Sequence, residues 1–198
     1  MKTRIHKLLI LLLLCLSYAS GFSSTKYSIN EAWTFSFEGS GKESKSIVSF
    51  PHTWNAEDAI DDTPGFYRGE AWYKKEIYLP SDYQNKIVYL YFEGANQVTD
   101  VYVNEKHVGQ HKGGYTRFCF DISGYIKLGE DNTFTLKVSN AYDPMVPPLS
   151  ADFTFFGGIY RDVYLDVREP IHISPTDRAS SGVYISTPSV DIDKAILN

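Results

Sequence analysis

The 198-residue sequence contains only two cysteines, Cys15 and Cys119. If the first segment is removed, as its pattern predicts, Cys119 remains alone and an intrachain disulfide is excluded. Stability must then come from a buried core. Cys119 lies between Phe118 and Phe120, and we interpret it as a small buried hydrophobe rather than a reactive thiol.

A cationic surface and a long apolar run are also absent. The formal net charge is -5, and lysine and arginine do not cluster beyond the first residues, which argues against a nucleic-acid partner. No apolar stretch after Leu16 is long enough to span a bilayer, so we expect no membrane span in the mature chain. His107 and His111 are four residues apart on an expected hairpin, which makes them a poor pair of zinc ligands.

The N-terminal segment has the pattern of a leader. Three cations precede an apolar run at residues 8–16, and the small residues Ala19 and Gly21 follow as cleavage points. The run lacks an amphipathic period, which disfavours a buried helix, and leucine rather than a small residue precedes Cys15. We interpret residues 1–21 as a secretory signal peptide and expect export to the periplasm or the extracellular space.

Period-two alternation dominates the remaining sequence, and no helical period is sustained. The run 87–92 is almost entirely apolar or aromatic, as in a strand that is covered on both faces. Many short strands separated by turn residues predict an all-β antiparallel sandwich or barrel. The expected strands are 32–37, 47–50, 71–79, 87–92, 100–103 in a hairpin with 107–109, 117–122, 133–138 and 159–167.

The most informative stretch is Gly157–Leu165, where a Gly-Gly turn leads into an alternating strand. Arg161 interrupts the apolar face of that strand. It either extends to water from a strand end or forms a buried pair with a carboxylate.

A break follows the expected domain, which we assign to residues 22–175. Residues 171–177 are interpreted as a last strand and a crossing, and Ser-Ser-Gly at 180–182 as a linker. A new alternation starts at 183–187 and continues at 195–197. Because such strands need neighbours, we expect residues 176–198 to be a linker and the first strands of a truncated second β-domain.

Six short motifs occur together in this order, and each alone is weak. They are Phe50–Asn55, Tyr67–Gly69 with Trp72–Lys75, Phe92–Asn96, Val103–Asn104 with Val108–Gly109, Phe120–Ile122 and Gly157–Val163. Together they resemble the N-terminal sugar-binding domain of glycoside hydrolase family 2, with the Pro-His-Thr-Trp-Asn motif closest to the β-galactosidase-like branch. Its structural signature here would be Trp54, Gly158, Arg161 and Asp162.

The resemblance implies a jelly-roll, galactose-binding-domain-like sandwich, followed by an immunoglobulin-like domain and a catalytic TIM barrel. It also implies retaining hydrolysis of a β-linked oligosaccharide or polysaccharide by two carboxylates about 5–5.5 Å apart. Those carboxylates would lie on the barrel, so no catalytic residue is assigned here and the chain alone should be inactive. No cofactor is expected in this part, a monovalent or divalent cation is implied for the full-length enzyme, and homo-oligomer formation is left open.

Three residues are candidates for sugar contact by the same resemblance. Asn96 can both donate to and accept from a hydroxyl, Asp143 is a strong hydroxyl acceptor implied to lie near a bound cation, and Asp152 precedes Gly158 by six residues. Asn96 and Asp143 are equally suited to holding tight turns.

Two other functions remain open from the sequence. A stand-alone carbohydrate-binding module would share the fold without catalysis, and a purely structural sandwich would serve contacts between domains. Departures from the better-known galactosidase pattern at residues 143–148 leave the sugar open between galactose, glucuronic acid and another pyranose.

Overall fold

A computed structural model describes residues 24–37, 45–58, 60, 65–150 and 152–196. Within these ranges the chain forms strands and connecting loops, with one short 3-10 helix, η1, at Ser81–Tyr83. The expected signal peptide, 1–21, lies outside the described residues. No helix in the described part is long and apolar enough to cross a membrane.

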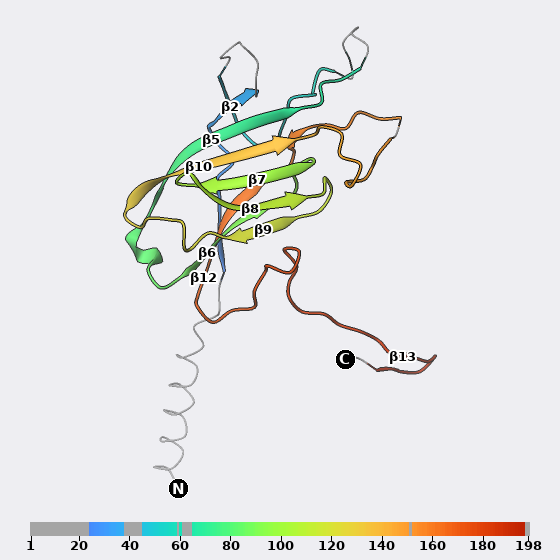
Figure 1. The fold of residues 1–198 in the computed structure, drawn as a ribbon. Helices are drawn as coiled ribbons and strands as arrows, with labels where there is room; N and C mark the ends of the chain where they lie inside the picture. Colours follow the sequence, from blue (N-terminus) through green and yellow to red (C-terminus); the bar gives the residue numbers. More distant parts are fainter. Residues whose placement is uncertain (1–23, 38–44, 59, 61–64, 151, 197–198) are drawn as a thin grey trace.

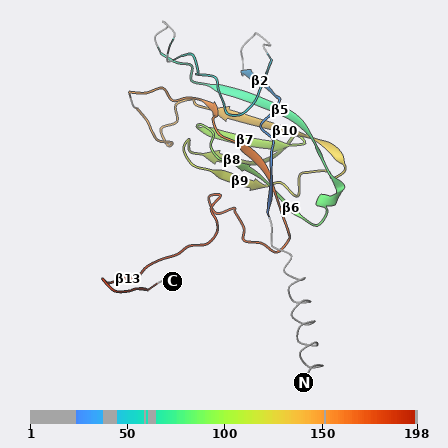
Figure 2. The same cartoon turned by 180° about the vertical axis from the view of Figure 1, so that it is seen from behind.

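Two large antiparallel sheets form a sandwich (Figures 1 and 2). The strands are β1 Thr25–Ser28, β2 Trp33–Phe37, β3 Ser46–Val48, β4 His52–Thr53, β5 Glu70–Leu79, β6 Ile87–Phe92, β7 Val98–Val103, β8 Lys106–Lys112, β9 Phe118–Asp121, β10 Glu130–Ser139, β11 Gly158–Ile159, β12 Val163–Arg168, β13 Ser189–Val190 and β14 Ala195–Ile196. One sheet has the order β1-β12-β6-β9 and the other β3-β2-β5-β10-β7-β8. The chain passes repeatedly between the sheets, and the predicted all-β jelly-roll sandwich is confirmed.

Alternation along the strands builds the core between the sheets. In β10 the inward residues Phe134, Leu136 and Val138 are fully buried, while the residues between them are partly exposed. They pack in one cluster with Tyr73 of β5 and Leu90 of β6. Burying large side chains of this kind stabilises a fold by about 1.5–3 kcal/mol each, which suits a domain without a disulfide.

The strand β6 is covered on both faces, as its apolar sequence predicts. On its outer face the Tyr89 hydroxyl is 2.8 Å from His172 Nε2, and the Tyr91 hydroxyl donates to the Ala179 carbonyl at 3.2 Å. The expected last strand at 171–177 is wrong, because this segment forms bends and turns. Arg168 donates to the Ile173 carbonyl at 2.7 Å, which helps to turn the chain back across the sheet.

The stretch Gly157–Leu165 is not one continuous strand. β11 pairs with β4 in a small sheet, and β12 joins the four-stranded sheet after a bend at 160–162. Asn30 fixes this bend, because its Nδ2 donates to Asp162 Oδ1 and its Oδ1 accepts from the Val163 N–H, both at 2.8 Å. The prediction of a single strand at 159–167 is therefore wrong at its start.

The final described residues pair only as the short β13–β14 ladder. The expected strand at 183–187 does not form, and its apolar members Val183, Tyr184 and Ile185 are exposed. Strands without partners leave backbone groups unpaired, which explains the irregular conformation. A second, immunoglobulin-like domain beginning here remains a prediction.

Candidate functional site

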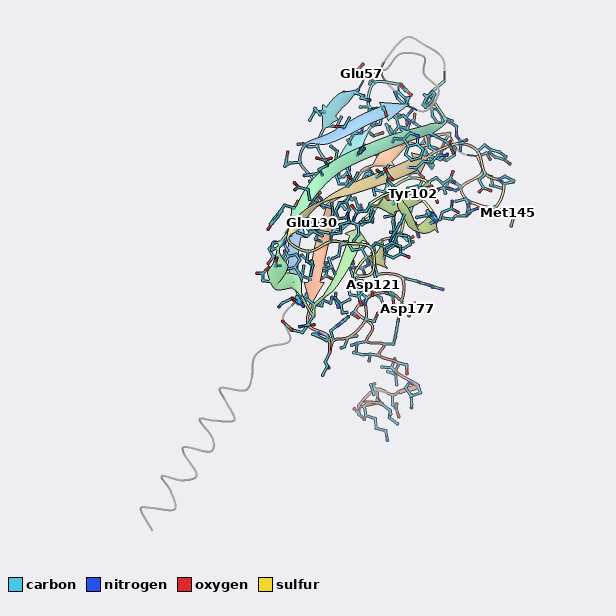
Figure 3. The ribbon with its side chains drawn as sticks, turned by 60° about the vertical axis from the view of Figure 1, so that its left-hand side comes forward. Glu57, Tyr102, Asp121, Glu130, Met145 and Asp177 are labelled. Carbon is cyan, nitrogen blue, oxygen red and sulfur yellow. The ribbon has the colours of Figure 1, made fainter. Side chains whose placement is uncertain are left out.

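The three predicted sugar contacts lie on loops that follow β6 and β10. Met145, labelled in Figure 3, marks the loop after β10, and Glu57 marks the loop after β4. The short β4–β11 sheet joins the start of the loop after β4 to the end of the loop after β10, because Gly158 pairs with Thr53 and Ile159 with His52.

Asn96 is 4% exposed and joins two loops. Its backbone N–H donates to the Gly158 carbonyl at 2.9 Å, and its side-chain Nδ2 donates to the Phe156 carbonyl at 2.8 Å. A Cβ atom at Gly114 would lie 2.1 Å from Asn96 Oδ1, so only glycine fits beside the amide oxygen. The turn-holding role of Asn96 is thus present, and its predicted sugar contact stays a prediction.

Asp143 begins the loop after β10 and also holds a turn. Its Oδ1 accepts from the Met145 N–H at 2.9 Å, and its backbone carbonyl accepts from Val146 N–H at 3.1 Å. Its Oδ2 lies 3.5 Å from Lys112 Nζ, and the side chain is 26% exposed. The carboxylate borders a hollow of about 390 Å³, so one oxygen can still accept a hydroxyl.

Gln97 brings the loops of Asn96 and Asp143 together. Its side-chain Nε2 donates to the Val146 carbonyl at 2.8 Å, and its backbone carbonyl accepts from the Gly113 N–H at 2.9 Å. This residue follows Asn96 directly, yet nothing in the sequence pattern had marked it.

Asp152 is exposed, and the structure describes no hydrogen bond or ion pair for it. The aromatic residues after it divide into two environments. Phe155 is buried, stacks edge-on with Phe66 and lies under the Arg68 guanidinium at 4.9 Å, whereas Phe153 and Phe156 are exposed. Phe155 therefore packs its loop against the loop that carries Phe66 and Arg68.

A pair of fully buried amides, Asn55 and Asn140, organises the same loops and was not predicted. The Asn140 amide accepts from Gly69 N–H at 2.8 Å and donates to the Phe155 carbonyl at 2.9 Å. The Asn55 amide accepts from Gly157 N–H at 2.7 Å and from Asn140 at 3.2 Å. The only sequence signal is an asparagine directly after Trp54 and another directly after a strand.

The signature residues Trp54 and Gly158 have close packing roles. A Cβ on Gly157 would lie 2.0 Å from the Trp54 ring. Gly158 has φ +122°, and a Cβ there would lie 2.5 Å from the His52 carbonyl oxygen, so no other residue fits without movement. Both glycines allow the chain to return against β4.

The other two signature residues, Asp162 and Arg161, differ. Asp162 accepts from Asn30 and from the Tyr164 hydroxyl at 2.9 Å. Arg161 is exposed in the bend, 5.9 Å from the Tyr160 ring, and has no ion-pair partner among the described residues. Its extension to water is the observed state, and the expected anchoring ion pair is absent from this part of the structure.

Electrostatics near β4 favour neutral groups. The His52 Nδ1 atom lies 2.8 Å from the Tyr73 hydroxyl. Burial lowers the pKa of His52 and raises the pKa of Tyr73, so both side chains are uncharged at neutral pH. On the opposite sheet, burial raises the pKa of Cys119 to about 11, which agrees with an unreactive thiol.

A cation beside Asp143 would meet lysine ammonium groups, because the hollow there is lined by Lys112 and Lys137 as well as by the carboxylates of Asp143, Glu70 and Asp100. Among the described residues, no group of three or more His, Cys, Asp or Glu side chains could hold a metal ion.

Comparisons with known proteins agree on one family. A family model described as "Glycosyl hydrolases family 2, sugar binding domain" matches residues 17–170. A Beta-glucuronidase of Bacteroides fragilis is 40% identical over 157 residues, 79% of this chain and 23% of that protein. A Beta-galactosidase of Thermoanaerobacter pseudethanolicus is 39% identical over 152 residues, 73% and 20% of the two chains.

Solved structures show the same fold. Bacteroides uniformis beta-glucuronidase 2, covalently bound to cyclophellitol-6-carboxylate aziridine, superposes with a TM-score of 0.79 at 35% identity. The match covers 88% of this chain and 22% of that chain. The present chain therefore spans about a quarter or less of the length of these relatives.

Proposed function

Because this chain belongs to glycosyl hydrolase family 2 through its sugar-binding domain, we propose that it is the N-terminal part of an exported retaining β-glycosidase. The observation that carries the proposal is the loop cluster, by which we mean the loops that follow β4, β6 and β10. Within it, Gln97 joins the loop of Asn96 to that of Asp143. An amide and a carboxylate held together in this way can bind the hydroxyl groups of one sugar.

The chemistry itself would lie outside this chain. Retaining hydrolysis needs an acid/base carboxylate and a nucleophilic carboxylate, and we assign neither role to any residue here. In the proposal this domain supplies a preformed wall of the sugar site, residues 1–21 direct export, and the isolated chain is inactive.

The finer assignment of the sugar divides between two classes. The motif Pro51–Asn55 favours a β-galactoside, whereas the 40% identical relative is named Beta-glucuronidase. Rates of the longer protein on matched nitrophenyl β-galactoside and β-glucuronide would decide between them. Failure to hydrolyse any nitrophenyl β-glycoside in a broad panel would overturn the enzymatic proposal.

The role of the loop cluster is tested by Asp143→Asn in the longer protein. The amide keeps an oxygen for the Met145 N–H but loses the charge, so kcat/KM should fall about tenfold or more, the loss of one charge-assisted hydrogen bond. Asp131→Asn, an exposed residue of β10, is the matched control and should leave the rate unchanged. Equal rates for both variants would remove Asp143 from the site, and Asp152→Asn would then be tested in the same way.

A stand-alone carbohydrate-binding module is the competing function. With most of the sugar site elsewhere, we expect the chain to bind galactose or glucuronate no tighter than about millimolar. Micromolar binding of either monosaccharide in a calorimetric titration would favour the binding module instead.

A further inference from the structure

A groove of about 710 Å³ lies beside the edge strands β8 and β9 and is lined by apolar, polar and positively charged residues. Its lining includes three cationic side chains, Lys112, Arg117 and Arg178, and no aspartate or glutamate. The volume is in the range of sites that take small molecules. In a chain of net charge -5, a groove with only cations departs from the average surface.

The walls of the groove are fixed by the fold. One wall is the segment after β12, where the Cys119 thiol donates to the Pro175 carbonyl and the Tyr91 hydroxyl to the Ala179 carbonyl, each at 3.2 Å. On the other side the His111 ring stacks on Phe118 with centroids 4.0 Å apart. A ligand would therefore meet a groove that is already formed, at a low cost in ordering.

The cations are available to a ligand. Arg117 and Arg178 are exposed, and the structure describes no ion pair for either side chain. The neighbouring Asp177, labelled in Figure 3, is engaged with the Tyr184 hydroxyl. Lys112 lies 3.5 Å from Asp143, so it connects the groove with the loop cluster.

We propose that this groove binds an anionic oligosaccharide, with its carboxylate or sulfate groups on Arg117 and Arg178. Guanidinium forks match both groups in geometry and form strong, charge-assisted hydrogen bonds with them. The exposed ring of Tyr115 offers a face for a pyranose, and Gln110 and Thr116 can bond its hydroxyls. The choice of a saccharide rests on the proposed function, and it deepens that function by naming an anionic polysaccharide as the substrate class.

The test is calorimetric titration of the chain with three β-linked tetrasaccharides at low salt, where exposed charges are least screened. One contains glucuronate, one carries sulfate esters and one is neutral. We expect one or both anionic ligands to bind about tenfold or more tightly than the neutral ligand. The glucuronate and sulfate arms identify which anion the groove takes.

Arg117→Gln and Arg178→Gln should each weaken anionic binding by about tenfold, the loss of one charge-assisted contact. Lys74→Gln removes the same charge from an exposed position on β5 and should leave binding unchanged. Both arginines are exposed, so unfolding midpoints should also stay unchanged and lost binding can be attributed to the groove.

Three results would overturn the proposal. These are equal affinity for neutral and anionic ligands, equal weakening by Lys74→Gln, and binding of an acidic peptide without binding of either anionic saccharide, which would make the groove a protein-docking surface. The proposed glycosidase function fails separately, on the nitrophenyl glycosides, whose small size does not require the groove.

Discussion

The loop cluster around Asn55 and Asn140 and the basic groove beside β9 both contain polar side chains, but in different states. The two asparagines are fully buried, and their amides bond to backbone groups from two loops, the one after β4 and the one after β10. Arg117 and Arg178 are exposed and have no ion-pair partner among the described residues. Buried and paired polar groups fix a conformation, whereas exposed and unpaired cations leave their hydrogen-bonding capacity to a ligand.

The largest expected effect on the free energy of unfolding is in the loop cluster, at Gly158. Gly158→Ala should lower the free energy of unfolding by about 3–5 kcal/mol, because a side chain is strained at this φ and would meet backbone. Gly124→Ala is the matched control, since a Cβ there has nothing within 4 Å. Urea unfolding of both variants is the measurement. A change at Gly158 no larger than at Gly124 would show that the β4–β11 contact does not restrain the loops.

Asn140→Ala should have the next largest effect. It removes the partners of the Gly69 N–H and the Phe155 carbonyl in a buried place, and we expect a loss of about 3 kcal/mol in unfolding free energy. Gln110→Ala removes an exposed amide that bonds to Asp100 and should change stability by about 0.5 kcal/mol or less. Similar losses in the two variants would contradict the distinction drawn between buried and exposed amides.

Most of the fold could be predicted from the sequence because alternation reports burial directly. The hairpin of β7 and β8 and the doubly covered β6 follow from patterns within a few residues. The break between β11 and β12 could not be predicted, because its cause, Asn30, lies more than 130 residues earlier in the chain. For the same reason Arg161 was placed in a strand that does not extend through it.

The candidate site was less predictable than the fold. Asn96 and Asp143 were assigned through the family resemblance and remain predictions, and the contact that joins their loops is made by Gln97, which has no local pattern. The basic groove was even less predictable from the sequence. Arg117 and Arg178 are 61 positions apart, and they line one groove only because the segment after β12 folds back over the four-stranded sheet.

The two regions each contain one half-buried histidine, which gives a smaller effect that depends on pH. Burial lowers the pKa of His52 in the loop cluster and of His111 in the groove below their usual value of 6.5. The unfolded chain therefore takes up protons first as pH falls, so stability is full above about pH 6.5 and declines in more acidic solution. His52→Gln and His111→Gln should each flatten the profile of unfolding free energy between pH 7 and 5. An unchanged profile in both variants would show that neither ring is desolvated in solution.

The smallest expected effect on stability is at the groove itself. Arg117→Gln and Arg178→Gln remove charges that pair with no described residue, so the unfolding free energy should change by about 0.5 kcal/mol or less. Because the three cations repel one another, the double variant should be no less stable than the parent, and any gain should shrink as salt is added. A loss of about 2 kcal/mol or more in unfolding free energy would mean that the arginines hold the segment after β12 in place. Their role would then be to stabilise the fold, as the buried asparagines of the loop cluster do.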